Sequence, residues 1–174
     1  MYQLLKLGYT SLWLELGLLS ECEYDKQLAT FKTSADKNTE HYRYATFRKF
    51  LTSRKRLTEQ ELDNYLKVAY SDQDEPMAGS AIVDILREIE LTDSQFEKVC
   101  ASLEDFGVDR ATQLISRHKL LLQLKSGNLS DSLFNECLQS GDGVVQNIFI
   151  NLSDKNKLQQ LVDHGITKAI KKQG

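Results

Sequence analysis

Leu57-Thr58-Glu59-Gln60-Glu61-Leu62 begins with a leucine, a hydroxyl residue and an acid, and this three-residue phrase returns along the chain. The phrase occurs five times, as Leu19-Ser20-Glu21, Leu57-Thr58-Glu59, Leu91-Thr92-Asp93, Leu129-Ser130-Asp131 and Leu152-Ser153-Asp154. Successive copies start 38, 34, 38 and 23 residues apart. A period in this range is typical of stacked helical hairpins.

Each phrase has the residues that begin an α-helix. A Ser or Thr side chain at the N-cap accepts a hydrogen bond from one of the first backbone N–H groups, which have no partner inside the helix. In the first three copies a residue three positions later can complete a capping box: Glu23, Glu61 and Gln95. In the first four copies the leucine before the cap can pack on an apolar residue at the fourth helical position: Tyr24, Leu62, Phe96 and Phe134. The fifth copy has Lys157 there and Leu158 next, so its apolar contact should be weak or shifted.

A second helical stretch lies between phrases and is clearest over residues 71–86. Asp74 can cap a helix whose first turn contains Pro76, and apolar residues then recur at helical spacing at Met77, Ala81, Ile82, Ile85 and Ile89. Small residues at 78–81 should let a neighbouring helix approach closely. This stretch resembles the HEAT repeat, and residues 57–90 carry the resemblance best, whereas residues 91–128 depart from it with Gly107-Val108-Asp109 at the turn.

The resemblance implies a short right-handed α-solenoid of about five HEAT-like hairpins. We therefore expect one all-α domain over residues 1–174, with an N-terminal capping helix at 1–18. The expected units are 19–56, 57–90, 91–128, 129–151 and 152–174. Leu28, Leu66, Cys100, Leu138 and Leu161 occupy similar places in the first helices and should be core residues.

Composition favours a compact cytoplasmic protein. The 174 residues are 41% hydrophobic and include one proline, so there is little room for linkers. Three cysteines without paired spacing fit a reducing compartment, where Cys22 and Cys137 should be semi-buried. Lys6 and Glu15 argue against a signal peptide, and no run of about 18 apolar residues exists to span a membrane.

Charge is divided into blocks along the chain. The net charge is −3, but residues 41–56 contain six cations and no acid, whereas residues 57–107 contain thirteen acids and three cations. Such blocks indicate complementary surfaces, either within the molecule or toward a partner. The helix dipole offers another explanation, because it favours acids at helix starts and cations at helix ends.

The basic block supplies most of the candidate binding residues. Its interleaved aromatic residues fit nucleic-acid contact in principle, although Tyr44, Phe47 and Leu51 also have the spacing of a helical core stripe. Phe47 should be core, and Tyr42 is the better surface candidate. The candidate contacts are Tyr42, Arg43, Arg48, Lys49, Arg54, Lys55, Arg56 and Arg117.

No catalytic, metal-binding or cofactor motif is present in the sequence. His41, His118 and His164 are far apart, and no phosphate-binding glycine loop occurs. We therefore expect a non-enzymatic protein-binding module, a small adaptor or an immunity-like inhibitor, with no metal and no cofactor. The alternative is a nucleic-acid-binding helical-repeat protein that uses a basic concave face.

Overall fold

The computed structural model describes residues 4–108, 111–125, 127, 129–140, 143–150 and 152–164. In these residues the chain forms a short 3-10 helix and ten α-helices, and it forms no strand. The all-α class is therefore confirmed. The elements are η1 (Leu4–Leu7), α1 (Leu12–Glu15), α2 (Glu21–Thr33), α3 (Thr39–Thr52), α4 (Glu59–Tyr70), α5 (Glu75–Glu88), α6 (Asp93–Asp105), α7 (Thr112–Lys125), α8 (Asp131–Gln139), α9 (Gly143–Ile150) and α10 (Lys155–His164).

The helices group into two compact units, residues 1–111 and residues 112–174. The division falls inside the expected hairpin 91–128, between α6 and α7. Each unit has buried apolar residues of its own. The expected single array of five stacked hairpins stays a prediction.

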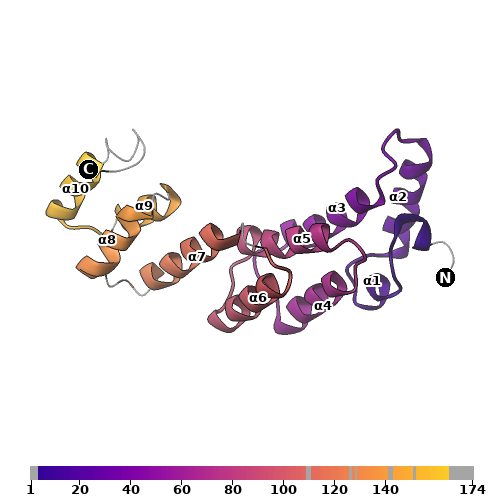
Figure 1. The fold of residues 1–174 in the computed structure, drawn as a ribbon, viewed down its shortest axis with the longest axis horizontal. Coiled ribbons are helices and arrows are strands. Elements are labelled where there is room, and N and C mark those ends of the chain that lie inside the picture. Colours follow the sequence, from indigo (N-terminus) through magenta and orange to yellow (C-terminus); the bar gives the residue numbers. More distant parts are fainter. Residues whose placement is uncertain are drawn as a thin grey trace. The chain divides into compact units, whose positions relative to one another are not determined.

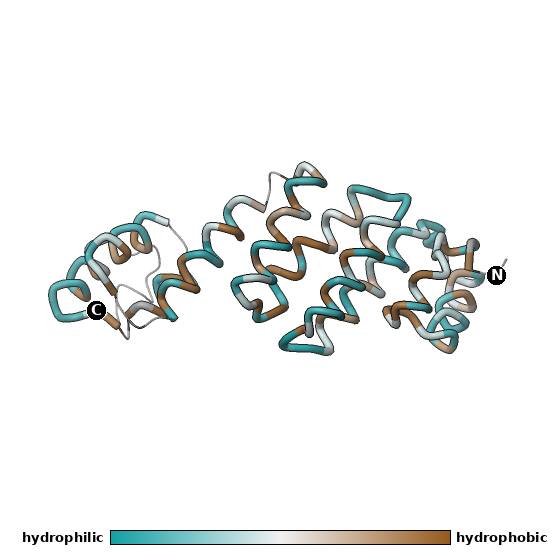
Figure 2. Tube along the Cα trace, turned by 90° about the horizontal axis from the view of Figure 1, so that it is seen from below, coloured by the Kyte–Doolittle hydropathy of each residue, from teal (hydrophilic) through white to brown (hydrophobic). Residues whose placement is uncertain are grey.

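The first unit has two layers of helices. Helix α5 packs against α3, α4 and α6, and α4 packs against α6 (Figure 1). The second helices α3 and α5 thus contact each other, as do the first helices α4 and α6. Figure 2 shows apolar and polar turns alternating along each of these helices, as expected when one stripe of a helix is buried and the other is solvated.

Four of the five predicted helix starts have the expected N-cap residue, but the capping box predicted with Glu23 is not complete, and the Glu23 carboxylate instead accepts from Lys49 Nζ. The side chains of Thr58 and Thr92 form complete capping boxes with Glu61 and Gln95. The hydroxyls of Ser20 and Ser130 each accept one backbone N–H, at 3.2 Å in both cases. At the fifth start the cap moves by one residue, because Asp154 Oδ1 accepts the N–H groups of Asn156 and Lys157, both at 2.9 Å.

The apolar contacts around these caps follow the same pattern. The leucine before the cap and the residue at the fourth helical position are buried together in the first three copies: Leu19 with Tyr24, Leu57 with Leu62, and Leu91 with Phe96. In the fourth copy, Phe134 is buried and Leu129 packs against its cluster. The shifted cap of the fifth copy places Leu158 at the fourth position and leaves Leu152 exposed, as the sequence indicated.

Helix α5 begins and packs as predicted. Asp74 Oδ1 accepts the Met77 N–H at 2.9 Å, and the residues of the predicted apolar stripe are buried. The small residue Gly79 does allow a close approach, but by the turn after α6 rather than by a helix. A Cβ added at Gly79 would lie 3.0 Å from Val108 Cγ2.

The predicted N-terminal capping helix is wrong, because this segment forms two short pieces, η1 and α1. Gly8, with φ of 74°, takes a left-handed conformation that disfavours other residues, and it separates the two pieces. The interruption turns Tyr9 and Trp13 inward, where both are fully buried. The apolar character of the segment therefore serves the core of the first unit.

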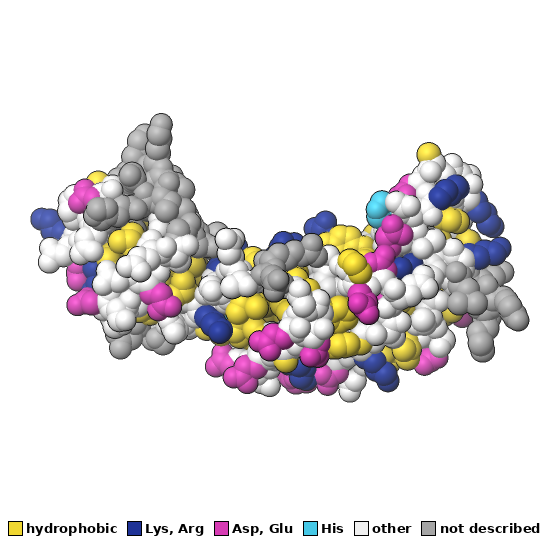
Figure 3. Space-filling view, viewed as in Figure 1, with side chains coloured by type: hydrophobic (Ala, Val, Ile, Leu, Met, Phe, Trp, Pro, Cys, Tyr) yellow, Lys and Arg dark blue, Asp and Glu magenta, His cyan; other side chains and the backbone are white. Residues whose placement is uncertain are grey.

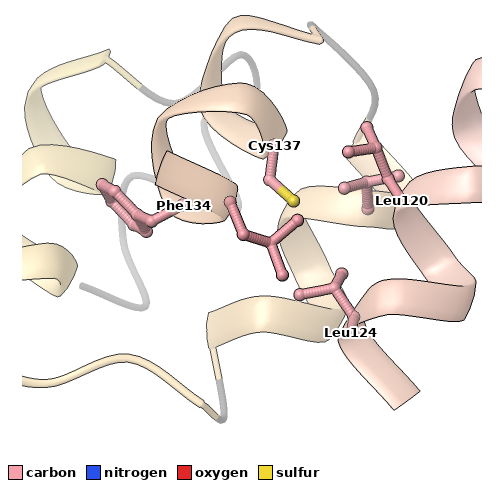
Figure 4. Packing of buried hydrophobic residues seen from close by; sticks show 6 residues of the cluster. Leu120, Leu124, Phe134 and Cys137 are labelled. Carbon is pink, nitrogen blue, oxygen red and sulfur yellow. The ribbon is translucent and has the colours of Figure 1, made fainter. Parts of the chain in front are cut away.

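The second unit packs around a small apolar cluster contributed by α7, α8 and α9 (Figure 4). In this cluster Cys137 of α8 points toward Leu120 and Leu124 of α7, whereas Phe134 lies on the side of α8 away from them (Figure 4). Leu138 is only partly buried against it, and the Leu161 side chain lies outside the described residues.

The burial predicted for the cysteine and leucine residues agrees only in part with the structure. Leu28 and Leu66 are buried, as predicted. Cys100 is half-buried rather than a core residue, Cys22 is exposed and Cys137 is fully buried. Helical spacing identifies the buried stripe, but each residue's burial depends on which neighbour covers it.

Candidate interaction surfaces

Helix α3 positions almost the whole basic block. Its apolar stripe faces inward, with Phe47 and Leu51 fully buried, as predicted for Phe47. The Phe47 ring lies 4.4 Å from Trp13 and 4.9 Å from Tyr65, measured between ring centroids. This aromatic residue is therefore part of the core and is not available to stack on bases.

Tyr42 is half-buried rather than freely exposed. Its ring meets Phe31 edge-on at 5.6 Å, and its backbone carbonyl accepts a hydrogen bond from the Tyr9 hydroxyl at 3.0 Å. With Lys49 and residues of α2 it lines a hollow of about 330 Å³. Tyr42 is therefore partly accessible from this hollow.

Arg43 is a structural residue and not a surface contact, since it is 1% exposed. Its Nε donates to Asp72 Oδ2 at 2.9 Å, and its Nη1 donates to the Leu7 carbonyl at 3.0 Å and to Thr39 Oγ1 at 3.1 Å. A Cβ added at Gly8 would collide with this guanidinium. Burial of an arginine requires paired charge and satisfied donors, and these partners supply both.

The ion pair of Arg48 is longer than those of the other cations in the basic block. Arg48 Nε lies 3.8 Å from Oδ2 of the buried Asp84, while Arg87 Nη1 donates to Asp84 Oδ1 at 2.7 Å. The Tyr44 hydroxyl also donates to Asp84, at 2.7 Å. Burial, followed by this hydrogen bond, raises the pKa of the Tyr44 hydroxyl. One cluster therefore contains Tyr44 and Arg48 from α3 together with Asp84 and Arg87 from α5.

Lys49 and Arg54 pair with acids of neighbouring first helices. Lys49 Nζ lies 2.6 Å from Glu23 Oε1 of α2, and Arg54 Nε lies 3.3 Å from Glu61 Oε1 of α4. The Arg54 guanidinium also stacks on the Phe50 ring at 3.9 Å. Because Glu61 accepts the Thr58 N–H and the Arg54 contact, its pKa is lowered.

The remaining candidate residues differ in their ion pairing and in the unit to which they belong. Arg56 donates through Nε and Nη2 to Glu90 Oε2, at 3.0 and 2.9 Å. Lys55 is exposed and has no ion pair with any described residue. Arg117 is half-buried on α7, in the other unit, so it is not assigned to the surface formed by α3.

Ion pairs within the first unit therefore account for most of the cations in the basic block 41–56. Five of its six cations pair with acids from α2, α4, α5 and the adjoining turns, leaving Lys55 outside the ion pairs of the described residues. Of the two alternatives that the charge blocks left open, complementary surfaces within the molecule account for most of the block. The pairs are Arg43–Asp72, Arg48–Asp84, Lys49–Glu23, Arg54–Glu61 and Arg56–Glu90.

The first unit carries a net negative charge. Residues 1–111 hold 14 Lys and Arg against 20 Asp and Glu, a formal charge of −6. On α6, Asp93, Glu97 and Glu104 lie four and seven residues apart, which places them on one helical stripe. All three are exposed, and none forms an ion pair with a described residue. Figure 3 shows carboxylates gathered over α6 and α4 on this side of the unit.

An exposed aromatic residue lies at the end of α4, near the end of α6. The Tyr70 side chain is 49% exposed, although its ring packs on Phe106 at 5.0 Å. Its hydroxyl donates to Asp105 Oδ2 at 2.6 Å, so the ring is held in one orientation. We define the α6 acidic surface as Tyr70, Asp93, Glu97, Glu104 and Asp105. The sequence analysis identified 57–107 as an acidic block but named none of these residues as candidates.

The described residues contain no group of side chains suited to a metal ion. A second hollow, of about 590 Å³, is lined by the starts of α3 and α5 and by Arg43, and neither described hollow is lined by a histidine. His41 instead lies beside Asp36 at 2.7 Å. In this part of the chain, no three His, Cys, Asp or Glu side chains form a group suited to a metal ion. Every described helix is too short or too polar to cross a membrane.

Comparison of the chain with protein families, with curated proteins and with solved structures gave no match.

Proposed function

We propose that this chain is a non-enzymatic, HEAT-like protein-binding module, an adaptor or immunity-like inhibitor acting in the cytoplasm. Its partner is a protein with a basic surface, and the contact is the α6 acidic surface. The observation that carries the proposal is the difference between the two charge blocks. The cations of 41–56 are mostly paired internally, whereas Asp93, Glu97 and Glu104 remain exposed and uncompensated among the described residues.

Two physical features support a protein partner. Uncompensated acids on one face steer a basic partner and suppress acidic ones. Tyr70 supplies a large ring that loses little conformational freedom on binding, because Phe106 and Asp105 already fix it. Tyrosine is among the residues that most often dominate binding energy at protein interfaces.

The nucleic-acid alternative has less support. Strand binding requires a series of cations free to contact phosphates. Arg43 is buried, and Lys49, Arg54 and Arg56 lie next to carboxylates. Binding to DNA or RNA would first have to displace these internal partners.

The test is capture from native extract with a charge-reversed surface and a matched control. Glu97→Lys with Glu104→Lys reverses the α6 acidic surface. Glu15→Lys with Asp25→Lys makes the same change in net charge at exposed acids elsewhere in the first unit. We expect a protein that binds the wild type and the control to be lost from the α6 variant, with nuclease treatment having no effect.

Equal loss from both double variants would show that net charge alone attracts the partner, and would overturn the assignment of the surface. Capture that disappears on nuclease treatment would instead support the alternative function. Circular dichroism of each variant establishes that the fold is retained.

A further inference from the structure

The cluster between α3 and α5 is unlike the other ion pairs of the first unit. Two arginines, Arg48 and Arg87, share the single carboxylate of Asp84. The Asp84 side chain is only 4% exposed, whereas the side chains of Arg48 and Arg87 are 53% and 52% exposed. A buried acid thus anchors two guanidinium groups that face solvent.

Most hydrogen-bonding capacity of these arginines is unused. Arg87 donates one hydrogen bond to a described residue, to Asp84 at 2.7 Å. Arg48 donates none, since its 3.8 Å contact with Asp84 is an ion pair beyond hydrogen-bond distance. A guanidinium carries five N–H donors in a rigid planar fork that matches a carboxylate. The two side chains can therefore donate hydrogen bonds to an external oxyanion without breaking an internal hydrogen bond.

From this geometry we propose that Arg48 and Arg87 form a carboxylate-binding site on the α3–α5 face, for an acidic side chain of a protein partner. The two arginines and Asp84 together carry a charge of +1, which the nearby Glu88 reduces, so the attraction to a carboxylate depends mainly on the N–H donors of the two guanidinium groups. Tyr44 is a positioning residue here, because its hydroxyl holds Asp84 through the 2.7 Å hydrogen bond.

The surroundings favour a single carboxylate over a nucleic-acid strand. Glu88, exposed one helical turn beyond Asp84 on α5, adds a negative charge beside the site. The neighbouring cations Lys49 and Arg56 are occupied by Glu23 and Glu90. A chain of phosphates would find neither a continuous series of cations nor room free of acids, whereas an acidic peptide needs only one well-placed side chain.

This site is separate from the α6 acidic surface and does not depend on it. An adaptor with both surfaces would contact basic groups through α6 and acidic groups through the α3–α5 face. The two proposals can therefore fail independently.

The test uses a fluorescein-labelled 12-residue peptide of alternating Glu and Gly, titrated into the full chain at low salt. We expect Arg48→Gln with Arg87→Gln to weaken binding at least tenfold. Arg56→Gln removes one positive charge, as Arg48→Gln alone does, but from an exposed arginine that is paired with Glu90, and it should change binding less than twofold. The Nε–Hε NMR signals of Arg48 and Arg87 should shift on titration, and that of Arg56 should not.

The single variant Arg48→Gln decides the matter if the double variant unfolds, because it leaves the Tyr44 and Arg87 hydrogen bonds to Asp84 in place. We expect at least a threefold loss from it. The proposal is overturned if Arg56→Gln weakens binding as much as Arg48→Gln does. It is also overturned if a 12-residue oligothymidylate displaces the peptide at equal concentration, since that outcome identifies a general polyanion surface.

Discussion

Arg43 and Asp72 form an ion pair inside the first unit, with 2.9 Å between Nε and Oδ2 and side chains that are 2% and 0% exposed. The pair joins α3 to the turn that precedes α5. Asp72 Oδ1 also accepts the Asp74 N–H at 2.9 Å and so shapes the start of α5. A residue from the basic block is thus used to build the fold.

Breaking this pair should be costly. Arg43→Met or Asp72→Asn removes one partner from a buried ion pair, and such changes cost about 3–5 kcal/mol because a charge is left uncompensated. The double variant should be less destabilised than the sum of the two. Urea unfolding measures the loss of unfolding free energy in each single variant and in the double variant. The same cycle at the exposed Arg56–Glu90 pair should give less than about 1 kcal/mol, and equal values at the two sites would contradict the buried role.

The helix caps should differ in a defined way. Thr58→Ala and Thr92→Ala each remove a capping box and should cost about 1 kcal/mol of unfolding free energy. Asp154→Ala should reduce the helicity of α10, because Asp154 Oδ1 accepts the N–H groups of Asn156 and Lys157 in its first turn. Circular dichroism during urea unfolding checks this. Unchanged helicity in Asp154→Ala would show that Asp154 does not cap α10.

His41 should titrate above its ordinary range. The hydrogen bond and then the charge of Asp36 raise the pKa of His41 above 6.5, and the same contact lowers the pKa of Asp36. The contribution of His41 to stability is therefore present below pH 6.5 and is lost as the pH rises through the raised pKa. That of Asp36 is lost as the pH falls through its lowered pKa. NMR titration of the His41 ring should give a value nearer 6.5 in Asp36→Asn, and an unchanged value would contradict the contact.

The three cysteines should react in a fixed order. Cys22 is exposed and should be modified first by a thiol reagent, with the half-buried Cys100 slower. Burial raises the pKa of the Cys137 thiol to about 11, which leaves little reactive thiolate at neutral pH. We expect Cys137 to react only after unfolding. Mass spectrometry of timed samples gives the order, and Cys22→Ser should remove the fast phase alone.

Much of the local structure could be predicted from sequence, because it depends on residues within one helical turn. The caps at Thr58, Thr92 and Asp74 were identified from the residues that form them. The weak fifth start was also recognised, although the shift to Asp154 depends on backbone geometry. The N-terminal segment was mistaken for one helix because its apolar residues outweighed the effect of Gly8, whose left-handed conformation the sequence does not display.

The candidate surfaces could be predicted only in part. The opposite charges of 41–56 and 57–107 indicated complementary surfaces but not whether both belonged to one molecule. Arg43 and Arg56 read alike as basic residues near α3, yet one is buried and the other is 79% exposed at its side chain. That difference depends on which acid approaches each guanidinium from another helix.

By itself, the sequence determined the all-α class, most of the helix starts and the apolar stripes, since these follow from hydrogen bonds and spacing over three to seven residues. The pairing of charged side chains depends on the packing of helices that are distant in sequence. This packing paired Arg43 with Asp72, 29 positions away, and Arg56 with Glu90, 34 positions away, and left Asp93, Glu97 and Glu104 without partners among the described residues. The physical reason is that an ion pair requires two side chains within about 4 Å, and only packing of distant helices brings them so close.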